Sequence, residues 1–269
     1  MDFRKAFRVK PGRRLELAKL DTRFHAGLDE EAALELTRKH RKRLFDLQRA
    51  LMAEDRRSVL VVLQAMDAAG KDGAIRKVLS GLNPAGCRVT SFRAPSAEEL
   101  DHDFLWRVHK AAPARGEVGV FNRSHYEDVL IVRVHDLVPE KVWRKRYREI
   151  NLFEEYLTRQ GTTVVKIFLH ISKAEQKRRF EERIATPKKH FKVNPHDFGE
   201  RACWQDYMRA FEEVFQRCST KQAPWYVIPA DHKWFRDAAF AQILADTLAD
   251  MKPRYPKGDF DPAELVIPD

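Results

Sequence analysis

The segment Leu63–Ile75, LQAMDAAGKDGAI, combines a lysine with small residues and two acids. In a phosphate-binding loop, Gly, four residues and Gly-Lys precede a Ser or Thr, and backbone N–H groups and the lysine hold phosphate oxygens. Here Gly70-Lys71 is present, but Ala65 and Asp72 stand where the first Gly and the hydroxyl residue are expected. We interpret the segment as an altered phosphate loop rather than an ordinary turn. Besides Lys71, its predicted phosphate-contacting residues are Ala68, Ala69, Gly70, Asp72 and Gly73.

The two acids need a separate explanation, because a carboxylate beside bound phosphate is unfavourable unless a cation lies between them. We interpret Asp67 as a magnesium ligand or as a group that orients an attacking phosphate. For Asp72 we favour a cap at the start of the following helix, where a carboxylate is stabilised by about 0.3–1 kcal/mol. Asp67 and Lys71 are therefore the predicted catalytic residues of the loop.

A second group of polar residues lies in Phe121–Val134, FNRSHYEDVLIVRV. Asn122, Arg123, Glu127 and Asp128 follow a predicted strand directly, and open α/β sheets bind ligands at that position. The guanidinium of Arg123 can hold phosphate oxygens with two parallel hydrogen bonds, and Glu127 or Asp128 could support a metal. A polar turn in which Arg123 pairs with Glu127 explains the same residues equally well.

A third group is the basic stretch from Ala174 to Lys192, which holds seven Lys or Arg against three Glu, a net charge of +4. Arg179 and Arg183 are four residues apart and share a helix face, where like charges repel unless an anion lies between them. We predict anion binding here; the alternative is a solvated helix in which Glu175 pairs with Arg179. The predicted anion-binding side chains are Arg178, Arg179, Arg183, Lys188 and Lys189, and Arg183 is also predicted to act in catalysis.

The elements that must position these groups alternate between strands and helices, which indicates a parallel sheet covered on both faces. Apolar, β-branched runs predict strands at residues 58–66, 87–92, 116–124, 162–172 and 225–230. The sequence therefore predicts an α/β fold, a P-loop kinase-like three-layer sandwich in which helices flank a parallel sheet.

The remaining segments predict helices and a mobile cover for the site. One helix is predicted over residues 29–55 and another over residues 96–111, the latter with a capping box of Ser96 and Glu99. Residues 1–28 are predicted to form an extended, basic N-terminal arm and residues 29–269 the kinase-like domain. Within that domain, residues about 174–220 are predicted to form a helical lid insert, cut by prolines at 187 and 195.

Composition narrows the class of protein. The 269 residues carry a formal net charge of +10, which favours an anionic partner. No run of about 18 apolar residues is present, so we expect no membrane partner. The three cysteines have no zinc spacing, which predicts a reducing, cytoplasmic location with these residues as buried small apolar groups. Four aromatic residues at helical spacing are expected to pack in the core: Trp204, Tyr207, Phe211 and Phe215.

Together, the motifs MDAAGKDG, FNRSHYEDVL and RRFEERIATPKKHFK resemble those of the family-2 polyphosphate kinases, in the same order and over residues about 30 to 250. The resemblance implies a P-loop kinase fold with a helical lid that closes through Arg178, Arg179 and Arg183. It also implies Mg²⁺-dependent transfer of phosphate, with Mn²⁺ as a possible substitute, and homo-oligomers that are dimers or tetramers. Some members carry Asp where this chain has Asn122, which shifts the metal role toward Glu127 and Asp128.

The predicted function is reversible transfer of phosphate from inorganic polyphosphate to the adenine nucleotides AMP and ADP, giving ADP and ATP. One alternative is a nucleotide kinase that uses ATP as the donor. Another is a nucleic-acid-binding protein, which the sequence disfavours because no nucleic-acid-binding module is recognisable; nucleic acid is therefore not an expected partner.

Overall fold

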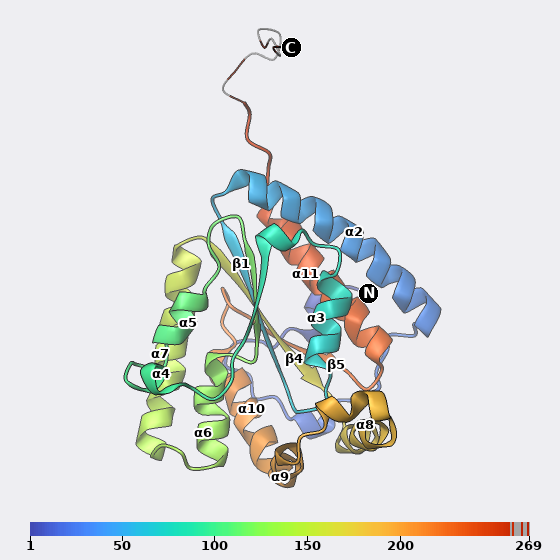
Figure 1. Cartoon of the computed structure of the whole chain (residues 1–269), viewed down its shortest axis with the longest axis vertical. Helices are drawn as coiled ribbons and strands as arrows, with labels where there is room; N and C mark the ends of the chain where they lie inside the picture. The colour runs from blue at the N-terminus through green and yellow to red at the C-terminus, as the bar shows by residue number, and fades with distance from the viewer. Residues whose placement is uncertain (259, 261–264, 266–267, 269) are drawn as a thin grey trace.

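The computed structural model describes residues 1–258, 260, 265 and 268. In this part of the chain, five strands form a parallel sheet in the order β2-β3-β1-β4-β5 (Figure 1). The strands are β1 (Ser58–Ala65), β2 (Cys87–Ser91), β3 (Val118–Asn122), β4 (Thr162–His170) and β5 (Trp225–Pro229). All five were predicted from their apolar runs. The prediction of a parallel sheet flanked by helices is confirmed.

Helices cover both faces of the sheet (Figure 1). On one face, α11 (Lys233–Met251) packs against α2 (Glu30–Glu54) and α3 (Lys71–Leu79). On the other face, α7 (Glu140–Arg159) contacts β4 and α10 (Trp204–Cys218). The other helical elements are α1 (Phe3–Phe7), η1 (Leu17–Lys19), η2 (Pro84–Gly86), α4 (Ala97–Leu100), α5 (Trp106–Ala111), η3 (His125–Val129), α6 (Ile131–Val134), α8 (Lys173–Ala185), η4 (Pro187–Lys192) and α9 (His196–Ala202).

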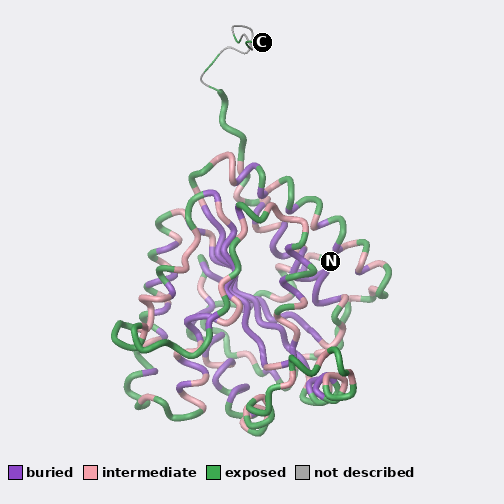
Figure 2. The backbone as a smooth tube through the Cα atoms, in the orientation of Figure 1, coloured by how far each residue is buried: buried purple, intermediate pink, exposed green. Residues whose placement is uncertain are grey.

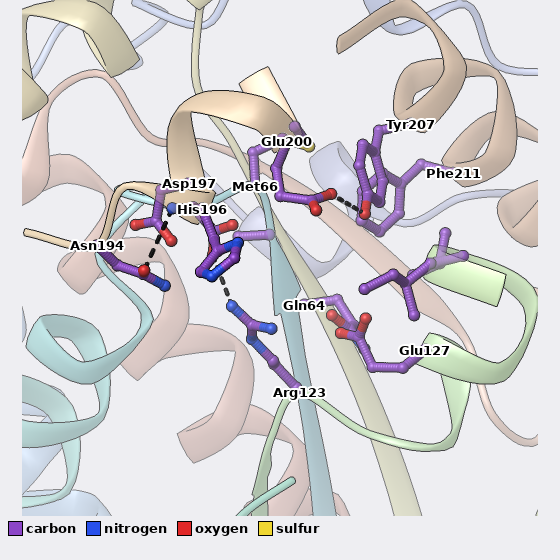
Figure 3. A pocket seen from close by; sticks show the side chains of 14 residues that line it. Gln64, Met66, Arg123, Glu127, Asn194, His196, Asp197, Glu200, Tyr207 and Phe211 are labelled. Atoms are coloured by element: carbon purple, nitrogen blue, oxygen red, sulfur yellow. Dashed lines mark hydrogen bonds and ion pairs between the residues drawn. The ribbon is translucent and has the colours of Figure 1, made fainter. Parts of the chain in front are cut away.

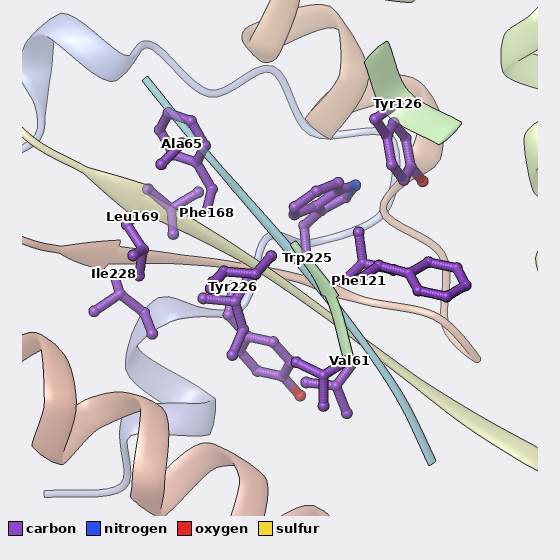
Figure 4. Packing of buried hydrophobic residues seen from close by; sticks show 14 of the residues in the cluster. Val61, Ala65, Phe121, Tyr126, Phe168, Leu169, Trp225, Tyr226 and Ile228 are labelled. Carbon is purple, nitrogen blue, oxygen red and sulfur yellow. The ribbon is translucent and has the colours of Figure 1, made fainter. Parts of the chain in front are cut away.

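The core sits between these layers, and the buried backbone follows the central strands (Figure 2). Every residue of β1 is buried, as expected for a strand whose two faces are both covered by helices. Phe168 of β4 packs against Phe211 of α10 at a ring separation of 4.4 Å, and Trp225 of β5 is fully buried in the same cluster (Figure 4). The predicted core role of the aromatic stripe on α10 is confirmed, because its four members are at most 8% exposed.

The N-terminal residues pack against the body of the protein, which corrects the expectation of an extended arm. The ring of Phe3 in α1 is 1% exposed and lies against Phe235 of α11 at 5.3 Å. The backbone N–H of Val9 donates to Trp225 O of the edge strand β5 (2.9 Å). Apolar side chains among the basic residues of this segment therefore anchor it, and its bonds satisfy part of the free edge of the sheet.

Two predicted helical segments are shorter in the structure than in the sequence interpretation. The helix expected over residues 96–111 is divided into α4 and α5 by a break at residues 101–105, although the capping box of Ser96 and Glu99 is present. The predicted lid at 174–220 includes α10, whose apolar face is part of the core. Within the predicted lid segment, α8, η4 and α9 lie before α10, and α8 and α9 are seen at the carboxyl end of the sheet (Figure 1).

Among the cysteines, only Cys218 is buried, whereas Cys87 and Cys203 are half-buried. The expectation that all three are buried apolar groups was therefore wrong for two of them. None of the helices in the described residues is both long enough and apolar enough to cross a membrane.

Candidate active site

The predicted phosphate loop joins the end of the central strand β1 to the start of α3. It runs from Met66 to Gly70, and α3 begins at Lys71. Two of its residues have left-handed backbone angles, Ala68 with φ of 62° and Gly70 with φ of 94°. Only glycine adopts this conformation at low cost, so Gly70 meets a real backbone requirement and Ala68 carries local strain. Because α3 begins directly after this loop, its N-terminus, where the first N–H groups of a helix have no partner within the helix, lies near the carboxyl end of β1.

Asp72 lies in the first turn of α3, but Gly70 rather than Asp72 is the N-cap residue. The predicted cap role is therefore wrong. The Asp72 carboxylate instead accepts a hydrogen bond from Asn122 Nδ2 (2.7 Å), which links α3 to the end of β3. In the structure Asn122 holds an acid of the loop, and its predicted contact with nucleotide or phosphate stays a prediction. The carboxylate still benefits from the helix dipole at this position.

Asp67, Arg123 and Lys71 converge at the loop, although they come from three different segments. Arg123 Nη2 donates to Asp67 Oδ1 at 2.7 Å. Lys71 Nζ donates to the backbone oxygen of Ala65 at 3.0 Å, and burial lowers the pKa of the Lys71 ammonium, against the opposing effect of Asp67. Arg123 has a left-handed φ of 61°, a strained conformation for a large side chain that points its guanidinium toward the loop.

The two acids of the second motif have different surroundings. Glu127 lines the cavity beside the loop, and burial raises the pKa of its carboxyl group. Asp128 pairs with Arg146 of α7 at 3.0 Å and also has a pKa raised by burial. The sequence left open whether Glu127 or Asp128 could support a metal. The geometry favours Glu127, because it faces the site, whereas Asp128 is part of an ion pair with α7.

A buried polar network holds η3, the short helix that carries Glu127. The Tyr126 hydroxyl donates to Glu154 Oε1 (2.8 Å), and Lys166 Nζ donates to the Tyr126 hydroxyl (3.0 Å) and to Glu154 Oε2 (2.5 Å). Lys166 and Glu154 are at most 1% exposed. Burial disfavours ionisation of Glu154, but Lys166 and His125 together outweigh this effect, so the pKa of the Glu154 carboxyl lies below its ordinary value. A network of buried hydrogen bonds of this kind gives η3 a defined position.

A cavity of about 200 Å³ lies between the loop and α9 (Figure 3). Its wall includes two acids that the sequence interpretation missed, Asp197 and Glu200 of α9. Burial and the neighbouring Asp67 carboxylate raise the pKa of Asp197, whereas Glu200 accepts a hydrogen bond from Tyr207. The signal that could have found them is position: both lie within the segment predicted to cover the site.

The basic residues of the third motif are spread over α8 and η4. Arg183 is 21% exposed and lies 3.8 Å from Asp197, which is one of the residues that line the cavity. Arg178 is 57% exposed and pairs with Glu175 and Glu182. Lys189 pairs with Glu182, and Lys188 is exposed. Apart from Arg183, these side chains lie on the outer surface of the suspected lid.

Arg179 has a different position, which corrects its predicted role. Its side chain is 4% exposed, and it donates to Ala68 O (3.2 Å), Ala69 O (2.7 Å) and Ala230 O (2.7 Å). These partners are backbone oxygens, and Glu175 accepts from Nε at 2.7 Å. All of its nitrogens are therefore occupied by protein acceptors, and the guanidinium supports the loop from behind instead of facing a phosphate. The suspected pairing of Glu175 with Arg179 is present.

Comparisons with known proteins agree with this geometry. The pattern of the Polyphosphate kinase 2 (PPK2) family matches residues 27–256. The chain belongs to this family. It is 48% identical to the AMP/ADP-polyphosphate phosphotransferase of Meiothermus ruber, over 98% of this chain and 99% of that one. It is 47% identical to the ADP-polyphosphate phosphotransferase of Rhodopseudomonas palustris, over 94% of this chain and 92% of that one.

Solved structures of the family show the same fold. The crystal structure of Polyphosphate Kinase 2 from Arthrobacter aurescens TC1 matches with a TM-score of 0.94 at 43% identity, over 98% of this chain and 94% of that chain. That of a putative polyphosphate kinase 2 from Pseudomonas aeruginosa matches with a TM-score of 0.84 at 35% identity, over 88% of this chain and 50% of that chain. The Polyphosphate kinase 2 fold therefore extends over nearly the whole chain.

Proposed function

We propose that this member of the Polyphosphate kinase 2 family transfers phosphate between inorganic polyphosphate and AMP or ADP, giving ADP and ATP. The observation that carries the proposal is the meeting of Lys71, Arg123 and Asp67 at the start of α3, beside one cavity. Two full-length relatives named as polyphosphate phosphotransferases support it. Because one phosphoanhydride is broken and a similar one is formed, the reaction is expected to run in both directions.

The chain's own groups can supply most of what phosphoryl transfer requires. The transition state spreads negative charge over the equatorial oxygens and needs positioning more than covalent help. The N–H groups at the start of α3 would orient one phosphate. Lys71 and Arg123 would neutralise charge on the oxygens of the transferred group, in a site where partial burial strengthens each interaction.

The donors at this site suit Mg²⁺, with Mn²⁺ as a substitute. Carboxylate and amide oxygens are the ligands that Mg²⁺ prefers, and it commonly binds through one or two carboxylates together with substrate phosphates and water. Within the described residues, no group of three or more His, Cys, Asp or Glu is arranged to hold a metal alone. Asp67, with Glu127 as a second donor, would therefore hold a cation that also binds the reacting phosphates, and the cation would offset their charge.

The basic outer segment would bind the rest of the polyphosphate chain. Arg183 lies 3.8 Å from Asp197 of the cavity wall, while Arg178, Lys188 and Lys189 continue the positive surface outward. Closure of α8, η4 and α9 over the site would exclude water, which otherwise hydrolyses the donor. A dimeric or tetrameric state and a cytoplasmic location remain proposals that follow from the sequence analysis.

The direct test is an assay of the purified chain with polyphosphate, Mg²⁺ and either AMP or ADP. We expect the next phosphorylated nucleotide as product. Absence of product from folded protein would refute the proposal. Replacing polyphosphate with ATP tests the alternative kinase, and binding to DNA or RNA without phosphate transfer would favour the nucleic-acid alternative.

Variants of the loop sharpen this test. Lys71→Ala or Asp67→Asn should each reduce turnover at least about tenfold, because each removes roughly 1.4 kcal/mol or more of transition-state stabilisation. Lys77→Ala is the matched control, since it removes an exposed lysine of the same helix. Unchanged turnover in both loop variants would show that the loop does not carry the reaction.

A further inference from the structure

Three consecutive backbone oxygens of the phosphate loop accept hydrogen bonds from side chains of other elements. Gln176 Nε2 of α8 donates to Asp67 O at 2.9 Å. Arg179 of α8 donates to the next two oxygens, Ala68 O and Ala69 O. Arg236 of α11 adds a second donor to Ala69 O at 3.3 Å. The loop is therefore fixed through its carbonyl groups by two helices that are far apart in the sequence.

Arg236 is built into this position as a buried charge with one fixed partner. It is 3% exposed, and its Nε and Nη2 donate to Asp237 Oδ1 at 2.8 and 2.7 Å. That arrangement leaves Nη1 directed at the loop, so close that a Cβ on Gly70 would lie 2.4 Å from it. The glycine is therefore required twice, for its backbone angle and for the approach of Arg236.

The geometry of the peptide unit explains what such contacts can do. A peptide is planar and trans, so its C=O and N–H groups point in opposite directions. Two guanidinium groups that hold Ala69 O therefore direct the N–H of Gly70 to the opposite side, at the start of α3. Hydrogen bonds from charged donors are stronger than neutral ones, and they also polarise that N–H group.

We infer that Arg236 is a positioning residue for the phosphate loop. Together with Arg179 and Gln176, it fixes the direction in which the loop N–H groups meet a phosphate, while touching no substrate itself. The inference rests on the proposed function for its kinetic test. If Arg236 and Asp237 only anchored α11, their replacement would lower stability alone. A positioning role instead predicts a loss of phosphate binding and turnover in protein that remains folded.

The test compares variants that alter the guanidinium with one that alters a similar group elsewhere. Arg236→Met combined with Asp237→Asn removes both buried charges, so that no uncompensated carboxylate remains. Asp237→Asn alone shows the contribution of the second change, and Arg236→Lys keeps the charge but loses the planar fork. Arg57→Met is the matched control, since Arg57 binds Glu54 and a backbone oxygen, that of Met251.

The readouts are the unfolding temperature, kcat and KM for polyphosphate and ADP, and calorimetric binding of inorganic tripolyphosphate. A displaced loop is expected to cost about 100-fold in kcat/KM, so we expect a loss of that order in the Arg236→Met double variant and partial recovery in Arg236→Lys. Asp237→Asn alone and Arg57→Met should stay within a few-fold of the native chain, whatever their unfolding temperatures.

Two results would overturn the inference. One is a double variant that is less stable yet keeps native kcat/KM and tripolyphosphate binding at temperatures where it is folded. The other is a native chain that does not bind tripolyphosphate at all. If the native chain binds tripolyphosphate but transfers no phosphate, the proposed function fails, and weakened binding in the double variant still supports the inference.

Discussion

Arg178 and Arg179 are neighbours in the chain and have opposite surroundings. The side chain of Arg178 is 57% exposed and pairs with two carboxylates of its own helix, those of Glu175 and Glu182. The side chain of Arg179 is 4% exposed, and it reaches backbone oxygens of the phosphate loop and of the segment after β5. One face of α8 therefore builds the site from behind, while the other offers positive charge to solvent.

This difference separates two kinds of cation, which under the proposed function would serve the same polyanion chemistry in different ways. A buried guanidinium with every nitrogen bonded to protein can shape a site but has no donor left for a substrate. An exposed one can bind a flexible anion but contributes little to the fold, because surface ion pairs are weak. Lys188 of η4 is exposed and Lys189 is partly exposed, so both resemble Arg178. Arg236 is buried and resembles Arg179.

The largest expected effect separates the two neighbours directly. Arg179→Met should lower the free energy of unfolding by about 3–5 kcal/mol, the cost of breaking a buried ion pair and leaving its partners unpaired. Arg178→Met should lower it by less than about 1 kcal/mol. Urea denaturation of both variants measures the contrast. Equal losses in the two proteins would mean that burial does not distinguish these side chains.

Much of this arrangement is readable from the sequence. The apolar runs placed every strand, and the strand–loop–helix order placed Asp67 and Lys71 at the loop because a phosphate site needs that context. Arg123 and Glu127 followed from their position after β3, since the carboxyl ends of parallel strands meet at one edge of the sheet. These inferences depend on local sequence patterns, and such patterns set the local structure whatever the distant elements do.

What the sequence did not supply depends on side-chain direction between distant elements. Nothing local distinguishes Arg179 from Arg178, and which of them faces the loop is set by how α8 packs against it. Arg236 lies in the first turn of α11 just after β5, so its position at the carboxyl edge of the sheet was a usable signal that the sequence analysis did not use. The split of the helix at residues 101–105 has a more local reason, since the Asp103 carboxylate accepts a hydrogen bond from the backbone N–H of Leu105 (2.9 Å), a turn that competes with a continuous helix.

The second prediction uses pH to examine the carboxylate that both arginines share. Burial opposes ionisation of Glu175, but hydrogen bonds from Arg178 and Arg179 lower its pKa from an ordinary value of 4.5 to about 2. A depressed pKa means that the folded state gains stability above pH 4.5 and loses it as the pH falls toward about 2. Glu175→Gln should therefore be less stable near neutral pH, and its deficit should shrink in acid.

Urea denaturation of the native chain and Glu175→Gln, repeated between about pH 6 and about pH 3, measures that deficit. Glu181→Gln is the control, because Glu181 lies on the same helix and is 61% exposed. A deficit that stays constant over this range would show that ionisation of Glu175 does not stabilise the fold.

The smallest expected effect concerns the exposed side of the comparison. Lys188→Ala with Lys189→Ala removes two cations of η4, and we expect KM for polyphosphate to rise about three- to tenfold with kcat little changed, since surface charges concentrate a polyanion without touching the reacting phosphate. The dependence of that KM on ionic strength should become weaker, because exposed charges are screened by salt.

Lys141→Ala with Lys145→Ala removes the same charge from the exposed surface of α7 and serves as the control. If both double variants raise KM equally, net charge rather than the position of η4 attracts polyphosphate; if kcat falls with Lys188 and Lys189 instead, these lysines act at the reacting phosphates.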